Sequence, residues 1–480
     1  MAKARITYLT PEEKEAIDEQ VMDVLENVGV AYNSPAVLDL VAGAGAIVDR
    51  EHLRARLPRT LVRECLAMAP RRVLLAGRDP ARDVWLGDGR LVTTSDGSAT
   101  YVQDDRTGER REGTLADLHR YMRLLDALDE VDILWSTISA RDLDPATTIL
   151  ETQAACFDAS GKHEQDGVRH PDFVAPLVEI LEAIAGAPLD RRPIFSALVC
   201  TVAPLQHDGP MTEAALDLAR RGVPIFILPM PLMGTTAPMS LAGTCVVHLA
   251  ELLSAIVPLQ LAKPGCAVVS CSTATVADMR SGGYLCGAPE KALLNAALTE
   301  MGKFYGLPTQ SDGVGADAGT PDLQAGVEGL GAALAPVWAG VDSLIAAGCL
   351  DGVQVASMAK AVLDNDTLGY VRRISAGDSF SAPEALADEI AAVGIGGHFL
   401  TRRSTRSRTH TGVVWQPGMF RRGLAPGRAG GSLVEDALER AEALLATRRT
   451  PPLSDDVRRH IDAVVLRFAE QRREAGGAAI

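Results

Sequence analysis

From about residue 91 the chain alternates short apolar runs with longer stretches in which apolar residues recur every three or four positions. Short apolar runs predict strands and the longer periodic stretches predict helices, so the pattern indicates repeated βα units. The strands are predicted at residues 91–95, 131–137, 162–168, 194–203, 224–230, 267–273, 308–313 and 343–349. The runs at 194–203 and 224–230 are strongly apolar, as parallel strands buried on both faces should be.

The helices of these units are predicted at residues 115–128, 146–159, 171–184, 211–221, 241–261, 289–305, 321–337 and 356–371. The spacing of the units suits right-handed crossovers, and eight strand and helix pairs close a barrel. We therefore predict the α/β class and a (β/α)8 TIM barrel over residues 91–375. A doubly wound open sheet is the alternative.

The segments on either side of the barrel are predicted to be mainly helical. Residues 1–90 form an N-terminal helical cap, with helices at 11–28, 35–44 and 58–68 that begin near a proline or a capping residue. Residues 376–480 form a C-terminal helical extension packed on the barrel. It holds a helix at 383–392, the segment GIGGHFL, a basic stretch at 402–408 and two helices that end near Glu474. The basic stretch is either a solvated loop or a docking site for an acidic partner.

Charge and composition exclude several classes of partner. The 62 acidic residues against 47 basic ones give a net charge of −15, which opposes binding to nucleic acids or to anionic membranes. The N-terminal residues lack the apolar stretch of a signal peptide. Residues 224–250 contain no acid, lysine or arginine, but prolines and a glycine interrupt them, so a membrane span is not expected. We predict a cytoplasmic protein.

The active site of such a barrel lies where the strands end, so the residues that follow each strand are the candidates. They are Ser95, Asp96, Trp135, Ser136, His163, Gln165, Asp166, Cys200, Thr201, Met230, Cys271, Ser272, Asp312, Cys349, Asp351 and Gly352. The sequence has no GxGxxG after a strand, no GxxxxGK[ST], no GxSxG and no HExxH, which disfavours nucleotide chemistry and the usual hydrolase sites.

For Trp135 and Asp312 the sequence allows either a role in ligand binding or a purely structural role. The ring face of Trp135 could bind a cation or could pack under a loop. Asp312 could complement a cationic ligand or could cap a turn.

The eight cysteines are scattered, without a CxxC pair, so we expect reduced core thiols and no metal site. The alternative is a zinc site formed by Cys200, Cys271 and Cys349, each near a strand end. Such a site would suit a methyltransferase that acts on a thiol or an alcohol.

The segment PMPLMGTTAPMSLAGTCVVHLAELLSAIVPLQLAKPGCAVV at 229–269 resembles the trimethylamine methyltransferase superfamily. Further similar segments follow in order: DMRSGGYLCGAPEKALLNAAL, YGLPTQSDG, ADAGTPDLQAG, GCLDGVQVASMAKAVLDND and GIGGHFL. Upstream, GDGRLVTTSDGSATYVQD and TLADLHRYMRLLDAL are also similar, so the resemblance covers about residues 10–425. The stretch ADAGTPD lacks the serine and lysine of the family's SKxPD-like sequence.

The resemblance implies a barrel that moves a methyl group from an amine to cob(I)alamin, a corrinoid carried by a separate partner protein. Founding members have pyrrolysine in the loop after the last barrel strand, and that position falls at or next to Gly352. A quaternary ammonium already carries its charge and leaves as a neutral amine without help from such a residue. The resemblance therefore implies a quaternary amine substrate of the glycine betaine, proline betaine or carnitine type, with Gly352 and Asp312 at the catalytic centre.

The expected substrate pocket combines aromatic rings around the ammonium with a group that binds a carboxylate. Trp135 is the first candidate for the rings, followed by Tyr101 and Phe157, and Gln165 and Met230 are expected to line the pocket. The candidates for the carboxylate are Lys162, His163 and His398. The family also implies a homo-oligomer. Apart from the zinc enzyme, the remaining alternative is a barrel that binds betaines without catalysis.

Overall fold

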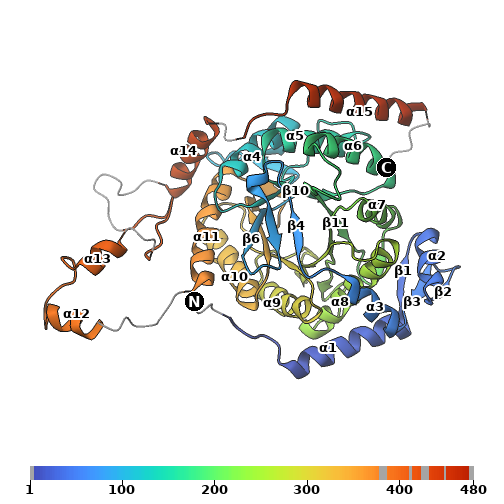
Figure 1. Ribbon diagram of the computed structural model, residues 1–480, viewed down its shortest axis with the longest axis horizontal. Helices are drawn as coiled ribbons and strands as arrows, with labels where there is room; N and C mark the ends of the chain where they lie inside the picture. Colours follow the sequence, from blue (N-terminus) through green and yellow to red (C-terminus); the bar gives the residue numbers. More distant parts are fainter. Residues whose placement is uncertain (1–4, 378–385, 410–412, 423–431, 448–449, 475–480) are drawn as a thin grey trace.

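The computed structural model describes residues 5–377, 386–409, 413–422, 432–447 and 450–474. Its centre is a closed barrel of eight parallel strands (Figure 1). In chain order the strands are β6 (Val92–Ser95), β9 (Ile133–Trp135), β10 (His163–Gly167), β11 (Phe195–Cys200), β13 (Ile225–Leu228), β15 (Val268–Ser272), β17 (Thr309–Asp312) and β18 (Ser343–Ala347). Each predicted strand contains one of them, including the polar run KHEQDGV, so the predicted barrel is confirmed.

A helix follows each strand and covers the outside of the barrel (Figure 1). The helices are α4 (Leu115–Ala127), α5 (Thr148–Ala159), α6 (Val174–Ala185), α7 (Gly209–Arg220), α8 (Leu241–Ala262), α9 (Pro289–Phe304), α10 (Leu323–Ala339) and α11 (Met358–Ala376). Strands such as β11 and β13 are apolar on both faces, one towards the lumen and one towards these helices, whereas β10 and β17 are mostly polar.

Apolar side chains and a short hairpin fill the lumen. The strands contribute Val92, Ile133, Leu198, Phe226, Leu228, Val269 and Cys271, and the hairpin of β4 (Val73–Leu75) and β5 (Val84–Leu86) packs against them. His163, the first residue of β10, donates from Nδ1 to the carbonyl of Ala76 beside this hairpin over 3.0 Å. The hairpin therefore closes the end of the barrel at which the strands begin, and a ligand has to enter from the other end.

The N-terminal cap is tied to the barrel by a small sheet that the sequence did not predict. The cap holds α1 (Pro11–Asp23), β1 (Val30–Tyr32), α2 (Pro35–Gly43), β2 (Ile47–Asp49), β3 (Arg54–Arg56) and α3 (Arg59–Met68). Strand β1 pairs in parallel with β12 (Gln206–His207), which lies in the loop after β11. The Tyr32 ring stacks on His207 with 5.0 Å between their centroids, and both contact Ser254 of α8.

Helix α8 is the one described helix that is long and apolar enough to cross a membrane. Most of its residues are buried between the barrel strands, the neighbouring helices and the cap. Its apolar composition is therefore explained by burial inside the fold.

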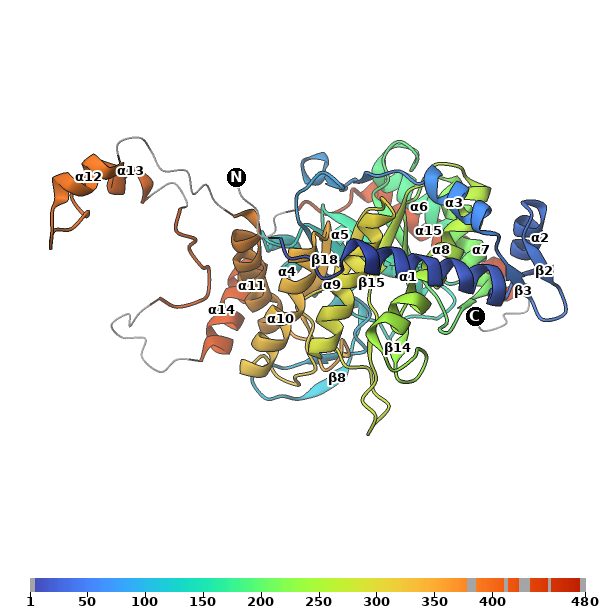
Figure 2. The same ribbon diagram turned by 90° about the horizontal axis from the view of Figure 1, so that it is seen from below.

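The C-terminal extension covers the barrel in part only. Helix α14 (Leu433–Leu445) packs on α11 and α4, and α15 (Asp455–Glu474) packs on α6 and α5. Between α11 and α14, helices α12 (Leu386–Val393) and α13 (Arg403–Arg408) bury no residue and project away from the barrel (Figures 1 and 2). The predicted helix at 383–392 begins outside the described residues and corresponds to α12.

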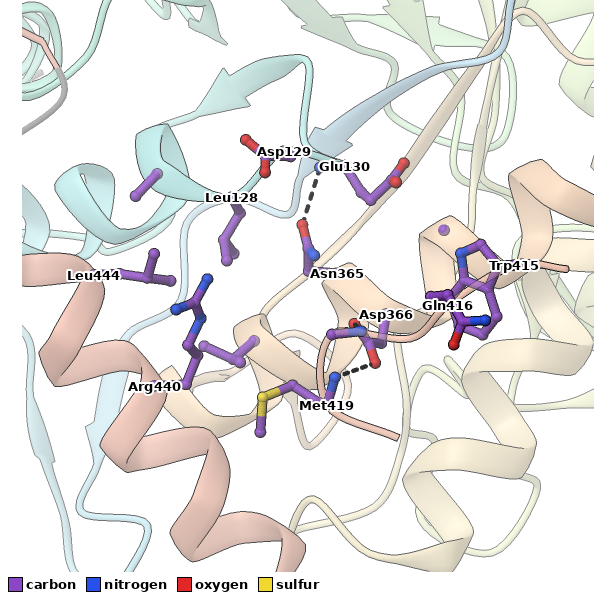
Figure 3. A pocket seen from close by; sticks show the side chains of 14 residues that line it. Leu128, Asp129, Glu130, Asn365, Asp366, Trp415, Gln416, Met419, Arg440 and Leu444 are labelled. Atoms are coloured by element: carbon purple, nitrogen blue, oxygen red, sulfur yellow. Dashed lines mark hydrogen bonds between the residues drawn. The ribbon is translucent and has the colours of Figure 1, made fainter. Parts of the chain in front are cut away.

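Residues 413–420 return from this projection to the barrel along a narrow pocket of about 180 Å³ (Figure 3). The carboxylate of Asp366 in α11 accepts from the backbone N–H groups of Gly418, Met419 and Phe420 at 2.6–3.0 Å. Three charge-assisted bonds to one carboxylate anchor the returning segment.

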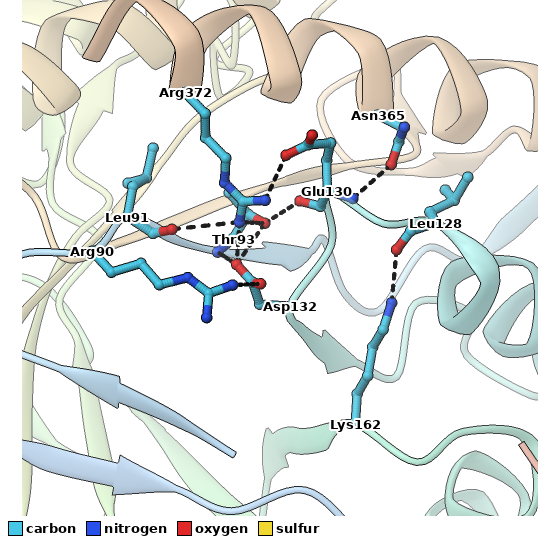
Figure 4. A network of polar contacts seen from close by, with 9 residues as sticks. All are labelled: Arg90, Leu91, Thr93, Leu128, Glu130, Asp132, Lys162, Asn365 and Arg372. Atoms are coloured by element: carbon cyan, nitrogen blue, oxygen red, sulfur yellow. Dashed lines mark hydrogen bonds and ion pairs between the residues drawn. The ribbon is translucent and has the colours of Figure 1, made fainter. Parts of the chain in front are cut away.

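A network of charges joins α11 to the beginning of β6 and β9 (Figure 4). The Arg372 guanidinium bonds to Asp132 and to Glu130, the latter over 2.6 Å, and it also donates to Thr93. Arg90 reaches the other oxygen of Asp132 over 2.5 Å. This network lies at the end of the barrel opposite the mouth and therefore stabilises the fold.

We predict that Arg372→Met lowers the free energy of unfolding by about 2 kcal/mol, because Asp132 is 7% exposed and loses a close cation. The matched control is Arg90→Met, whose side chain is 56% exposed and should contribute less than about 1 kcal/mol. Urea unfolding at neutral pH measures both. Equal losses in the two variants would contradict the role given to Arg372.

Candidate active site at the mouth of the barrel

The mouth of the barrel, where the strands end, lies above a layer of polar side chains. Gln310 of β17 donates across the lumen to Gln165 of β10 over 3.3 Å and also to Ser343 over 3.2 Å. The Cys271 thiol points at the Gln310 carbonyl at 3.6 Å. This layer forms the floor of the site, and it places the predicted residue Gln165 below the mouth, fully buried.

A buried lysine stands at one side of the mouth. Lys291 of α9 is 1% exposed, and its Nζ lies 2.7 Å from Asp312 at the end of β17. It also lies 3.3 Å from the Cys286 sulfur and 4.9 Å from the centre of the Tyr284 ring. The Tyr284 hydroxyl donates to Asp312 over 3.1 Å. Asp312 is thus at the mouth as predicted, but its charge is already paired within the protein.

A second carboxyl group, that of Asp96, lies next to this ion pair. It follows β6, is 8% exposed, and accepts a bond from the backbone of Gly97 over 2.9 Å. No cation among the described residues lies within 4 Å of it. Burial, and then the negative charge of Asp312, raise the pKa of Asp96 to about 7. The more distant charges of Lys291 and Lys360 lower the pKa of Asp96 in part, but no described residue forms a direct ion pair with it.

Trp135 lies at the end of β9, and Gly97, the residue after Asp96, packs against its ring. A Cβ built on Gly97 would come within 2.1 Å of the indole ring. Because only glycine permits this approach, Gly97 fixes the position of the indole. The neighbouring strands β6 and β9 thus end in a buried carboxyl group and an aromatic ring, two kinds of group that bind a cation without hydrogen-bond donors.

The loops that carry this cluster are locked together. The Asp317 carboxylate accepts from the backbone of Cys286 over 2.6 Å and of Gly287 over 2.8 Å. Glu328 in turn accepts from the backbone of Asp317 over 2.8 Å. These bonds join the loop after β15 to the loop after β17, and they keep Lys291 in place.

Several predicted residues lie elsewhere. His163 and Lys162 begin β10 and face the closed end, where His163 bonds to Ser196 over 2.9 Å and Lys162 donates to two backbone carbonyls. Burial lowers the pKa of His163 to about 4, so its imidazole is neutral. Phe157 is buried in the core between strands and helices. His398 is exposed between α12 and α13, on the segment that projects away from the barrel.

The remaining predicted residues lie around the rim. Met230 follows β13 and is 37% exposed, and Tyr101 in β7 (Tyr101–Gln103) is 41% exposed. Gly352 lies in the hairpin between β19 (Cys349–Leu350) and β20 (Val355–Ala356), with a positive φ of 59°. A Cβ there would meet only the Tyr284 carbonyl at 3.8 Å and Asp317 at 4.0 Å. The position therefore has free space next to the loop that carries Tyr284.

The comparisons with known proteins agree with this architecture. The family model of trimethylamine methyltransferase matches residues 2–477. The trimethylamine methyltransferase MttB2 of Methanosarcina mazei is 33% identical over 477 residues, 96% of this chain and 94% of that protein. The glycine betaine methyltransferase of Desulfitobacterium hafniense is 28% identical over 479 residues, 98% of each chain.

The chain belongs to the trimethylamine methyltransferase family. The family assignment made from the sequence motifs is confirmed, and so is the prediction of a methyltransferase. Among solved structures, the monomethylamine methyltransferase of Methanosarcina barkeri aligns with a TM-score of 0.53 at 12% identity, over 98% of this chain and 88% of that chain. This likeness supports the barrel fold.

The zinc alternative for this family member is not supported by the positions of the cysteines. Cys200 and Cys271 face the lumen, whereas Cys349 is packed among the helices around α4 and α11. Burial raises the pKa of all three thiols, which keeps them protonated. In the part of the chain that the structure describes, no group of three or more His, Cys, Asp or Glu residues is arranged to hold a metal ion.

Sequence reasoning missed Lys291 and Tyr284 because neither follows a strand directly. Tyr284 belongs to the long segment between β15 and α9, and Lys291 lies in the first turn of α9. One signal was present: Lys291, Leu294 and Leu298 lie on the same buried face of α9. A lysine in an apolar stripe needs a buried partner, which here is Asp312.

We predict that Lys291→Met lowers the free energy of unfolding by about 3 kcal/mol, because it leaves a buried carboxylate unpaired. The double variant with Asp312→Asn should recover most of this loss, since it contains no unpaired charge. Chemical denaturation of both variants at pH 8 measures the difference. A double variant as unstable as the single one would show that packing, not the ion pair, is responsible.

Proposed function

We propose that the protein transfers a methyl group from a quaternary amine to a corrinoid carried by a separate protein. The observation that carries this proposal is the Asp96 carboxyl group, which forms no ion pair with a described residue and follows β6, the strand next to the one that ends in Trp135. A quaternary ammonium has no N–H group, so it is bound by ring faces and by nearby negative charge. This corner supplies both, whereas Asp312 is occupied by Lys291.

The reaction requires that the ammonium be held in one orientation. A reduced corrinoid supplies a Co(I) nucleophile, and attack on the methyl carbon requires an in-line arrangement with the nitrogen. The substrate loses its positive charge as the methyl group leaves. A carboxylate in contact with the ammonium therefore stabilises the bound substrate more than the transition state. Trp135 and Asp96 would bind and orient the substrate, and the chemistry needs no proton from them.

The mouth also offers a surface that suits a corrinoid delivered from outside. Met230, Met239 and Met279 are exposed at its rim, and the sulfur atoms of Met239 and Met279 both lie about 3 Å from a Cβ built on Gly234. Flexible thioether side chains adapt to large apolar surfaces such as a corrin ring. The rim thus fits the proposed partner.

We propose substrates of the glycine betaine, proline betaine or carnitine type. Two features support them: Gly352 leaves free space at the position that the family resemblance aligns with pyrrolysine, and one relative is named for glycine betaine.

The reaction is tested by mixing the protein with cob(I)alamin and a panel of methylated amines, and by following methylcobalamin through its absorbance. Methylation by one quaternary amine and not by trimethylamine would support the proposal. Absence of methylation by every quaternary amine, with a cognate corrinoid protein present as well, would contradict it. Tight binding without methyl transfer would instead indicate a binding protein.

For Trp135→Ala we expect the affinity for the substrate to fall by about tenfold, because a cation and ring contact in a partly desolvated site is worth about 1–2 kcal/mol. Isothermal titration calorimetry with the active quaternary amine measures the change. Trp85, which is 41% exposed beside Arg72 on the closing hairpin, is the matched control. Unchanged binding to the Trp135 variant would remove this residue from the pocket.

Substrate binding should depend on pH through Asp96. Because the pKa of Asp96 is raised to about 7, the carboxyl group is largely neutral at pH 6 and ionised at pH 8. We therefore expect the affinity for a quaternary amine to increase as the pH rises from 6 to 8. In Asp96→Asn this dependence should disappear and KM should rise, while kcat is retained. An unaltered pH profile in that variant would exclude Asp96 as the group that pairs with the ammonium.

A further inference from the structure

The basic residues that the sequence suggested as partners of a substrate carboxylate do not lie at the mouth of the barrel. Lys162 and His163 face the closed end of the barrel, and His398 lies on the projecting segment. Lys291 reaches the mouth, but its charge is paired with Asp312. A cationic group for the anionic end of the substrate has to come from another place.

A cavity of about 570 Å³ lies beside the cation-binding corner, between the loop after β9 and the loop after β10. Two of its lining residues follow Asp96 and Trp135 closely in the sequence. Ser98, two residues after Asp96, and Ser136, the residue after Trp135, both line it, and they are joined by a backbone bond of 3.0 Å. The cavity therefore begins within two residues of Asp96 and one residue of Trp135 along the chain.

The wall of the cavity carries positive charge. Arg169, which follows β10, is exposed, and among the described residues its guanidinium makes no hydrogen bond or ion pair. Arg141, from the loop after β9, lies on the same wall, and its closest carboxylate is that of Glu112 at 3.9 Å. Two guanidinium groups that are free or loosely paired, in a concave site with several hydroxyls, form an environment for an oxyanion.

The first turn of α5 also lines the cavity. Thr148, Ile149 and Thr152 of α5 lie in its wall, and no side chain caps the N-terminus of the helix. The uncapped N–H groups favour an anion, but the Glu151 carboxylate in the same turn offsets the helix dipole. The positive charge of the cavity therefore comes from the arginines.

One acid, Asp166, lies at the inner end of the cavity, but its oxygens are occupied. It accepts from the Ser136 hydroxyl, from Gln153 over 2.8 Å and from the Gly167 backbone over 2.7 Å. Burial raises the pKa of Asp166, which reduces its negative charge. The positive charge of Arg169 acts on Asp166 as well and partly offsets this increase, so the acid and the arginine lie near each other in the cavity.

We propose that this cavity binds an oxyanion through Arg169, with Arg141 in support, and that the oxyanion is the carboxylate of the zwitterionic substrate. The proposal rests on the proposed function for its cationic end and adds the residue that selects the anionic end. Arg169 would make the enzyme prefer betaines and carnitine over choline and tetramethylammonium. A phosphate of the corrinoid nucleotide has the same chemistry and is the second source of an oxyanion.

The test compares Arg169→Gln with wild type in calorimetric titrations of four quaternary amines. Glycine betaine and carnitine carry a carboxylate, while choline and tetramethylammonium do not. The variant should bind the first two about tenfold more weakly, since one charge-assisted bond is lost, and it should bind the other two as wild type does. Arg280→Gln is the matched control, because Arg280 is exposed on another loop of the mouth and does not line the cavity.

The outcomes separate this inference from the proposed function. Equal binding of all four amines by wild type and Arg169→Gln, with methyl transfer retained, would overturn the oxyanion site and leave the function intact. If no quaternary amine binds, the proposed function fails. Titration with acetate and with inorganic phosphate then still tests the cavity, and binding that Arg169→Gln abolishes would support an oxyanion site.

A second arm distinguishes the two sources of the oxyanion. Methyl transfer is measured with cob(I)alamin and with cob(I)inamide, which lacks the nucleotide and its phosphate. If the substrate carboxylate occupies the cavity, Arg169→Gln raises KM for glycine betaine equally with both corrinoids. A defect that appears only with cob(I)alamin would overturn the carboxylate assignment and place the phosphate at Arg169.

Discussion

Closure of the barrel between β18 and β6 is the contact on which the site depends. Backbone pairing of these two strands brings the first strand of the barrel next to the last, and β17 lies on the other side of β18. As a result Asp96 and Asp312, which are far apart in the sequence, lie close enough for the negative charge of Asp312 to raise the pKa of Asp96. An open sheet of the same strands would leave them at opposite edges, and the site would not form.

The charge balance of the mouth follows from this closure. Two carboxyl groups and one lysine lie together in a region of low exposure, and Lys291 pairs with Asp312 because that pair also satisfies the Tyr284 hydroxyl. Asp96 is left over. A buried carboxyl group without a counter-ion is costly to ionise, and a bound cation removes this cost. A cationic ligand next to Asp96 would therefore favour the ionised form of this carboxyl group.

The closed end of the barrel and the cap make this arrangement stable. The β4–β5 hairpin fills the lumen at the end where the strands begin. At the same end, the ion pairs of Arg372 with Asp132 and Glu130 join α11 to the beginning of β6 and β9. On the opposite side, Glu251 of α8 accepts from the Thr201 hydroxyl and from the backbone of Leu205, which holds the loop after β11. These contacts hold both the closed end of the barrel and the loop after β11 in place.

The sequence by itself determined the barrel and the family, and it predicts strand-end residues as the candidate site. Alternation of apolar strands and periodic helices is a local signal, so all eight units could be located, and Asp96, Trp135 and Asp312 could be chosen because each follows a strand. Only the tertiary structure decided which charged side chains lie next to each other. His163 and Lys162 were placed at the wrong end because they begin β10 rather than end it. Lys291 was missed because its distance from Asp312 depends on the path of the long segment that leads from β15 to α9. Local patterns report burial and periodicity, whereas the pairing of two charges depends on the path of the chain between them.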